Sequence, residues 1–244
     1  MKRALPVLAA VALLAVGCGG SKTSATTDTA TAPPPPTTPA RAATTSLELF
    51  FLADDGKLVA DRRDVPATQA VATAALRELA SAPAGATTQV PEALTVSIAN
   101  GDAHVSGGTL SKAALAQVVY TLGEFPTVKT VDGTGRADVE EFAPAILVEH
   151  PAPDEQVTSP LHVTGTADTF EATFQYELKD SGGTLIAHGF TTATTGNGMR
   201  GTFDFTIPFS VDHTQDGTLV VYESSAENGS RIHVREIPLR LSAQ

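Results

Sequence analysis

Four carboxylates near the ends of predicted strands are the side chains best placed to bind a ligand. They are Asp168, Glu171, Glu223 and Glu227. If the loops at one end of the fold converge, these side chains would form one acidic patch suited to a cation or a polar ligand. The same residue types are also common as turn caps and at solvated strand edges. The sequence therefore leaves two interpretations open, a polar ligand patch and ordinary turn chemistry.

The sequence lacks the spacing patterns of common catalytic and metal-binding motifs. It has no HExxH pair, no GxSxG serine, no P-loop and no GxGxxG loop. Asp54-Asp55-Gly56 lacks the spaced ligands and terminal Glu of a calcium loop and is typical of a turn. We therefore predict no enzymatic activity, no cofactor and no metal site. The histidines are separated along the chain: His104, His150, His162, His188, His213 and His233. We interpret His188 and His233 as surface or half-buried strand residues.

The single cysteine follows a hydrophobic segment at the N-terminus. Two basic residues come first, residues 5–16 are almost all Ala, Val and Leu, and the small Gly17 precedes Cys18. This is the pattern of a signal peptide, and the segment is too short for a transmembrane helix. A lone thiol in an exported chain has no disulfide partner. The alternative is ordinary secretion with cleavage near Ala15 or Gly17, in which Cys18 has no role.

The segment Ala15-Val16-Gly17-Cys18 resembles the lipobox of bacterial lipoproteins. Ala15 departs from the pattern, which favours Leu there. The resemblance implies that Cys18 receives a diacylglyceryl group and that the signal is cut between Gly17 and Cys18. It therefore implies a mature protein held by acyl chains on the outer face of the cytoplasmic membrane.

The composition limits the classes of partner. The chain has 244 residues and a formal net charge of -11, which argues against nucleic acid and against binding anionic lipid by charge. Residues 18–45 are rich in Thr, Pro and Ala and include four consecutive prolines, so we predict a disordered spacer there. O-glycosylation of this spacer is left open. About 200 residues remain, which is enough for two domains.

Residues 46–135 have the pattern of an α+β domain. Asn100-Gly101 between two alternating runs is a strong hairpin signal, and Thr68 is the expected cap of the first helix. The predicted order is β-β-α-β-β-α-β. The strands are expected at 47–52, 57–65, 94–98, 103–105 and 127–131. The first helix is closed by Pro83 and Gly85, and the second begins near Ser111 and stops before Pro126.

Residues 145–242 have the pattern of an all-β immunoglobulin-like sandwich. Short alternating runs are separated by turn residues, and the aromatic residues of two runs fall on the inward face: Phe174, Tyr176, Phe203 and Phe205. A phase shift at Arg235-Glu236 predicts a bulge, and Pro238 predicts that the last strand lies at an edge. About seven strands are expected, at 146–148, 161–165, 172–179, 185–192, 203–209, 219–222 and 232–241.

Both domains resemble families of bacterial sporulation and germination. Residues 46–135 resemble the GerMN domain in the opening strand 47–51, the helix 74–79, the hairpin 96–105, the helix 114–122, and the segments 125–128 and 131–133. Residues 145–242 resemble the immunoglobulin-like Gmad domain of spore germination in the segments 151–153, 160–165, 170–172, 201–203, 219–223 and 227–230. With the lipobox, this order resembles envelope lipoproteins of high-GC Gram-positive (actinobacterial-type) bacteria.

These resemblances lead to two main hypotheses. The first is a non-enzymatic binding or scaffold lipoprotein of the cell envelope, related by family to sporulation or germination, with the membrane and envelope proteins as partners. The second is a lipoprotein that binds cell-wall glycan or a small ligand, and contact with peptidoglycan is left open. An enzyme is the third and weakest hypothesis, because the sequence shows no constellation of acid, base or metal ligands. Partner identity, process and oligomeric state are not determined by the sequence.

Overall fold

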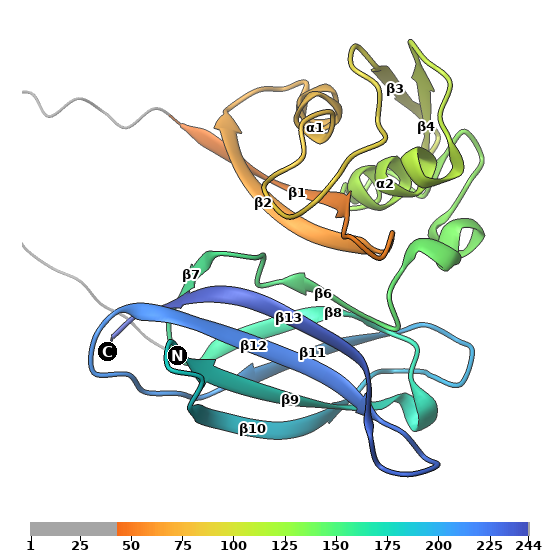
Figure 1. The fold of residues 1–244 in the computed structure, drawn as a ribbon. Coiled ribbons are helices and arrows are strands. Elements are labelled where there is room, and N and C mark those ends of the chain that lie inside the picture. Colours follow the sequence, from red (N-terminus) through yellow and green to blue (C-terminus); the bar gives the residue numbers. More distant parts are fainter. Residues whose placement is uncertain (1–42, 244) are drawn as a thin grey trace, which may run out of the picture. The chain divides into compact units, whose positions relative to one another are not determined.

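The computed structural model describes residues 43–243, which all belong to one compact unit (Figure 1). The predicted signal peptide, its cleavage site at Gly17 and Cys18, and nearly all of the predicted spacer lie outside the described residues. Within the described part of the chain, no helix has both the length and the apolar character needed to cross a membrane. The order of elements confirms an α+β domain followed by an all-β sandwich.

The α+β domain opens with a long antiparallel hairpin of β1 (Thr44–Leu52) and β2 (Leu58–Pro66), with Leu52 opposite Leu58. The second half of β1 is buried on both faces. The outer edge of β1 is covered by α2 (Lys112–Leu122) rather than by a strand. The Thr121 hydroxyl accepts the Phe50 N–H at 3.0 Å, and the Gln117 amide donates to the Phe50 carbonyl at 3.1 Å. Two buried polar side chains therefore replace the missing ladder partners.

The two helices differ in how they begin. The Ser111 hydroxyl accepts the Ala114 N–H at 3.1 Å and caps α2, which agrees with the predicted start of this helix near Ser111. The predicted cap of the first helix is wrong. α1 (Val71–Leu79) begins after Ala70 without a side-chain cap, because the Thr68 hydroxyl accepts the Ala70 N–H at 3.1 Å in a turn that precedes the helix.

A second, smaller sheet completes the α+β domain. β3 (Thr95–Ala99) and β4 (Asp102–Ser106) form the predicted hairpin, and Asn100 and Gly101 both have positive φ, at 53° and 87°. β5 (Thr130–Val131) pairs in parallel with β4 and is shorter than the predicted strand at 127–131. The reason is local: the Val128 N–H donates to the Phe125 carbonyl at 2.8 Å and forms a turn there.

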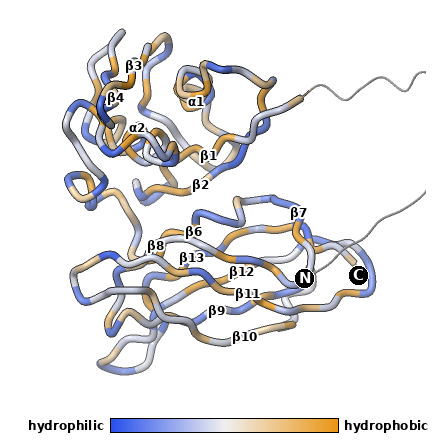
Figure 2. Tube along the Cα trace, turned by 180° about the vertical axis from the view of Figure 1, so that it is seen from behind, coloured by the Kyte–Doolittle hydropathy of each residue, from blue (hydrophilic) through white to orange (hydrophobic). Residues whose placement is uncertain are grey.

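The sandwich follows a short 3₁₀ segment, η1 (Arg136–Phe142), and has eight strands in two sheets. One sheet has the order β10-β9-β12-β13-β7 and the other β11-β8-β6. Figure 2 shows hydrophobic residues recurring along the sandwich strands and along α2. The sequence missed β7, which is only three residues long. The strands are β6 (Ile146–His150), β7 (Glu155–Val157), β8 (Leu161–Ala167), β9 (Thr173–Asp180), β10 (Leu185–Thr192), β11 (Gly201–Ile207), β12 (Gln215–Ser224) and β13 (Arg231–Leu241).

The bulge predicted in the last strand is present but lies earlier. His233 and Val234 together lie opposite one residue of β12, and His233 has a φ of 53°. The sequence placed the shift at Arg235-Glu236 because Val234 is apolar and continues the alternation. Val234 is nevertheless 44% exposed, since the extra residue turns it to the surface.

The prediction that β13 is an edge strand is wrong for its C-terminal part. β7 pairs in parallel with Leu239–Leu241. The Pro238 carbonyl accepts the Asp154 N–H at 2.7 Å, so the backbone of Pro238 faces away from β12. Because proline has no N–H, this orientation means that β12 loses no hydrogen bond at this position. Before Pro238, no described strand pairs with this side of β13. Residues 231–237 therefore keep a free edge.

Candidate functional site

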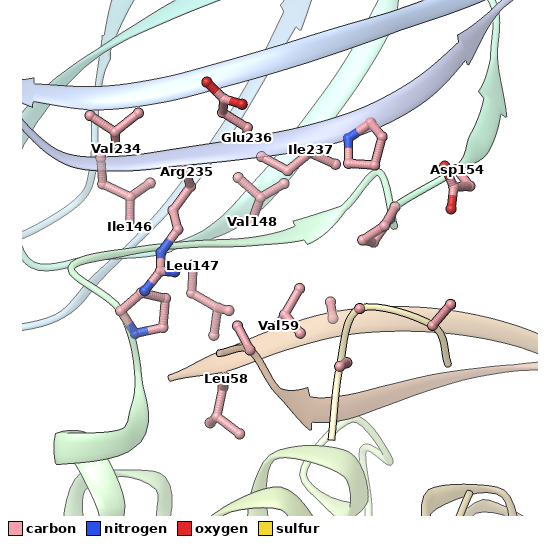
Figure 3. Close-up of a pocket in the computed structure, with 18 residues that line it drawn as sticks. Leu58, Val59, Ile146, Leu147, Val148, Asp154, Val234, Arg235, Glu236 and Ile237 are labelled. Atoms are coloured by element: carbon pink, nitrogen blue, oxygen red, sulfur yellow. The ribbon is translucent and has the colours of Figure 1, made fainter. Parts of the chain in front are cut away.

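A cleft of about 340 Å³ lies between the β1–β2 hairpin and two strands of the sandwich, and we call it the hairpin cleft (Figure 3). In Figure 3, Leu147 points from β6 toward Leu58 and Val59 of the hairpin, whereas Glu236 points away from the cavity. The wall is mainly apolar. Its main lining residues are Leu58 and Val59 from β2, Ile146 and Val148 from β6, and Val234 and Ile237 from β13.

The hairpin lies against the sandwich at the cleft because β6 contributes apolar side chains to the cores of both domains. Leu147 is 2% exposed and packs into the core of the α+β domain. Its neighbours Ile146 and Val148 point the other way and pack into the core of the sandwich. Successive side chains of a strand alternate between its two faces, so one short strand can bury apolar groups on both sides. The hairpin thereby covers one face of a strand at the edge of its sheet.

Arginine side chains reinforce this contact, and the first is Arg136 of η1. It pairs with Glu124 at the end of α2 and with Glu149 of β6, the latter at 3.2 Å between Nη1 and Oε1. It also donates to the Tyr120 carbonyl at 3.1 Å, and its guanidinium lies 4.7 Å from the centre of the Tyr120 ring. A planar guanidinium suits this combination, because it can pair with two carboxylates and stack on a ring at the same time. Arg136 therefore ties both domains to the segment between them.

Further ion pairs surround the cleft. Arg200, ahead of β11, pairs with Glu140 of η1 and donates to the Pro144 carbonyl at 2.7 Å. Arg235 of β13 pairs with Asp55 in the hairpin turn at 2.7 Å. The Arg200 contacts hold η1 and the following segment against the sandwich, and the Arg235–Asp55 pair holds the hairpin turn against it.

Glu48 of β1 is a buried carboxyl group whose pKa is strongly raised. Burial, followed by the nearby carboxylates Glu124 and Glu149, raises the pKa of Glu48 to about 8. Its Oε1 atom is buried and has no hydrogen-bond partner among the described residues. Arg62 is 3.7 Å from the other carboxylate oxygen. At neutral pH the folded protein therefore favours the protonated, neutral form of Glu48.

The four carboxylates singled out from the sequence lie around the loops that join the sandwich sheets. Asp168 accepts the Gly198 N–H at 2.8 Å, and the buried Glu223 accepts the Phe170 N–H at 2.9 Å. Glu171 donates its backbone N–H to the Asn197 side chain at 3.0 Å, and Glu227 lies in the β12–β13 turn. Asp168 and Glu223 thus act as turn caps in this structure. A ligand role for the four stays a prediction.

Within the described residues, no group of three His, Cys, Asp or Glu side chains is arranged to hold a metal ion. Some histidines lie beside carboxylates: His162 lies 2.7 Å from Asp204, and His104 lies 3.1 Å from Asp132 and 3.6 Å from Asp102. The two histidines interpreted as strand residues do lie in strands, His188 in β10 and His233 in β13. The hairpin cleft combines an apolar wall, paired charges at its rim and the free backbone edge of β13.

The four aromatic residues singled out from the sequence lie on the inward face of the sandwich, as the alternation predicts. Phe174 and Phe203 are buried, with ring centres 4.9 Å apart. Tyr176 and Phe205 are partly buried against the same core, and their ring centres are also 4.9 Å apart. These rings are thus committed to packing and are not available as a platform for stacking sugars.

Family models match both domains. Residues 48–132 match the family described as "Sporulation and spore germination", called Germane. Residues 145–230 match the "Immunoglobulin-like domain of bacterial spore germination", called Gmad2. The chain is a Germane domain followed by a Gmad2 domain. This confirms the two family resemblances that the sequence indicated. Domains of these families are generally non-catalytic.

A solved structure also resembles the chain: the tandem GerMN domains of the sporulation protein GerM from Bacillus subtilis, at 14% sequence identity. The match covers 83% of this chain and 62% of that chain, so this chain spans less than two thirds of its length. The TM-score is 0.33, which is too low for the likeness to bear on the fold. Comparison with the curated proteins gives no match.

The hairpin cleft and the contact beside it were not identified from the sequence. Nothing in the sequence pattern indicates that Leu147 lines the cleft, or that Arg136 and Glu48 lie near this contact. The one available signal was the run Ile146-Leu147-Val148, which is apolar at every position instead of alternating. Such a run indicates a strand buried on both faces.

Proposed function

We propose that this protein is a lipid-anchored, non-enzymatic binding protein on the outer face of the cytoplasmic membrane, where it contacts other proteins of the cell envelope. The lipobox-like segment ending at Cys18 supports the anchor. The Germane and Gmad2 domains support a binding role connected with sporulation or germination, because both belong to families of that description.

The free edge of β13 beside the hairpin cleft is the observation that carries the binding role. Residues 231–237 have unpaired backbone on the side away from β12, among the described strands. An extended segment of a partner can add to such an edge through main-chain hydrogen bonds and place alternate side chains in adjoining pockets. The apolar wall of the cleft lies at this edge and provides such a pocket.

The expected occupant is an extended segment of an envelope protein that carries one or a few apolar side chains. A volume of about 340 Å³ lies at the small end of the range for ligand sites, which suits side chains better than a large cofactor. The Arg235–Asp55 pair at the rim keeps the hairpin in place. The bound segment would then contact both the backbone of β13 and the apolar wall of the cleft.

A matched pair of substitutions tests this role in the full-length protein. Val234 lines the cleft and is 44% exposed, and Ile98 lies in the β3–β4 hairpin and is 41% exposed. Val234→Glu should lower recovery of envelope partners from solubilised membranes by about tenfold, because it places a charge on the apolar wall. Ile98→Glu makes the same change outside the cleft and should leave recovery unchanged.

Equal recovery with both variants would contradict binding at the cleft. Thermal unfolding of the two variants shows whether each is folded, and their similar exposure makes a large loss of stability in either unexpected. Point substitutions are preferable to removal of the Germane domain, since that deletion would expose Leu147 and damage the sandwich.

The anchor is tested separately by Cys18→Ala. The variant should appear in the medium or persist as an unprocessed precursor, because no acyl chains can be attached. Fractionation and mass spectrometry of the N-terminus distinguish these forms. A processed Cys18→Ala protein that stays in the membrane fraction would contradict lipid anchoring.

A further inference from the structure

Two large apolar side chains project from neighbouring loops of the Gmad2 domain. Phe170, between β8 and β9, is 54% exposed, and Met199, between β10 and β11, is 66% exposed. Single exposed apolar residues need no explanation. Here, however, two different loops present such residues, and both loops are held against each other.

Specific bonds hold the two loops together. The Asn197 N–H donates to the Thr169 carbonyl at 3.1 Å, and the Gly198 N–H donates to the Asp168 carboxylate at 2.8 Å. A side chain at Gly196 would come within 2.5 Å of the Thr169 carbonyl oxygen, so the loops pack too closely for any other residue there. Phe170 and Met199 each directly follow one of these bonded residues. Their relative position is therefore fixed by the fold.

The backbone that presents Phe170 is strained and well supported. Glu171 and Ala172 have φ values of 53° and 57°, a conformation that non-glycine residues seldom adopt. The buried carboxylate of Glu223 accepts the Phe170 N–H at 2.9 Å. Strain of this kind persists where the surrounding structure enforces it, and it is concentrated at binding and switch regions.

Apart from Arg200, the charged side chains of these loops are acidic. Asp168 and Glu171 lie in the β8–β9 loop and Glu227 lies in the β12–β13 turn, and none of the three makes an ion pair within the described residues. The nearby cation Arg200 is engaged with Glu140. The loop end is therefore apolar at its centre and negatively charged around it.

We propose that Phe170 and Met199 form a docking surface, here called the loop-end surface, for a second envelope protein whose matching face is an apolar pocket rimmed by lysine or arginine. Exposed Phe and Met supply the apolar anchors, and the unpaired carboxylates favour a basic rim. The acidic surroundings oppose an anionic membrane or a second copy of this acidic chain. The proposal deepens the binding role proposed above but uses a different surface from the hairpin cleft.

The test places a photoreactive phenylalanine analogue at position 170 or 199 of the full-length protein in intact cells. Phe190 in β10, which is 72% exposed and lies outside these loops, is the control position. Positions 170 and 199 should give the same crosslinked protein at a yield about tenfold above position 190. The crosslinked peptide of the partner, mapped by mass spectrometry, should contain apolar residues flanked by Lys or Arg.

Charge is tested in the same assay with Glu171→Gln and Glu227→Gln combined. This variant should lower the yield at position 199 by about threefold or more, and added salt should weaken the remaining difference. Crosslinks to lipid, crosslinks to a second copy, a partner peptide without basic residues, or yields no higher than at position 190 would each overturn the proposal. If positions 170 and 199 give no specific crosslink while Val234→Glu still lowers recovery of partners, the loop-end proposal is wrong and the cleft proposal is retained.

Discussion

The Gmad2 domain carries apolar side chains on two surfaces that differ in what covers them. On the β6 side, Leu147 is buried by the Germane domain, and the surrounding arginines are paired with carboxylates. At the loop end, Phe170 and Met199 are exposed, and Asp168, Glu171 and Glu227 make no ion pair within the described residues. Apart from the hairpin cleft and the free edge of β13, the first surface is thus covered within the chain, whereas the second has the composition of one half of an interface.

This difference predicts opposite responses to substitution. Changes on the β6 side should lower stability because they remove contacts that already exist. Changes at the loop end should leave stability nearly unaltered and alter only binding. The following substitutions test that distinction in order of expected effect.

The largest effect is expected at Leu147, the shared core residue. Leu147→Ala should lower the free energy of unfolding by about 3 kcal/mol, because it leaves a cavity between the two domains. Chemical denaturation followed by two probes, one in each domain, should still show a single transition. Leu185→Ala, at an exposed position of β10, is the control and should cost less than about 0.5 kcal/mol. Two separate transitions in the parent protein would contradict the coupling of the domains.

Arg136 should rank next. Arg136→Leu keeps an apolar contact with Tyr120 but leaves Glu124 and Glu149 without their cation, at a cost of about 2 kcal/mol. Burial already raises the pKa of Glu149, and loss of Arg136 should raise that pKa further. The destabilisation should therefore be smaller at pH 5 than at pH 7.5. An equal loss of stability at both pH values would contradict the electrostatic role of Arg136.

Glu48 should show a smaller effect of the opposite sign. Its pKa is raised from 4.5 to about 8 on folding, so its contribution to stability is complete below pH 4.5 and is lost as pH rises toward 8. Glu48→Gln mimics the protonated form. It should match the parent near pH 4.5 and be more stable by about 1–2 kcal/mol at pH 8. Denaturation curves at both pH values provide the measurement, and a variant less stable than the parent at pH 8 would refute the buried neutral acid.

The loop end should show the smallest effect on stability. Phe170→Ser and Met199→Ser should each change the free energy of unfolding by less than about 0.5 kcal/mol, since both side chains are largely exposed. A loss comparable with that of Leu147→Ala would show that these residues are part of the core. The distinction between the two surfaces would then fail.

Local elements were predictable from the sequence because their causes are local. Asn100-Gly101 supplies the positive φ values that a two-residue hairpin needs, and Ser111 supplies the cap of α2. The cap predicted at Thr68 failed since its hydroxyl is used in a turn before the helix. Nothing in the pattern distinguishes these two uses of a hydroxyl.

The two surfaces could not be derived in the same way. Leu147 and Arg136 acquire their roles only when two domains meet, so no spacing along the chain encodes their contacts. At the loop end the sequence drew attention to the carboxylates, but Asp168 and Glu223 cap backbone groups. Nothing in the sequence indicated that Phe170 and Met199 beside them would be exposed, because burial of an apolar residue depends on its tertiary neighbours.

The most direct test of the proposed function is photocrosslinking from the wall of the hairpin cleft in intact cells. A photoreactive residue at Val59, in the lipid-anchored full-length protein, should crosslink to an extended segment of an envelope protein. The same residue at Ile98, outside the cleft, should not. Efficient crosslinking from Val59 with none from Ile98 is the predicted result. Equal yields at the two positions, or no protein crosslink from Val59, would contradict binding at the cleft.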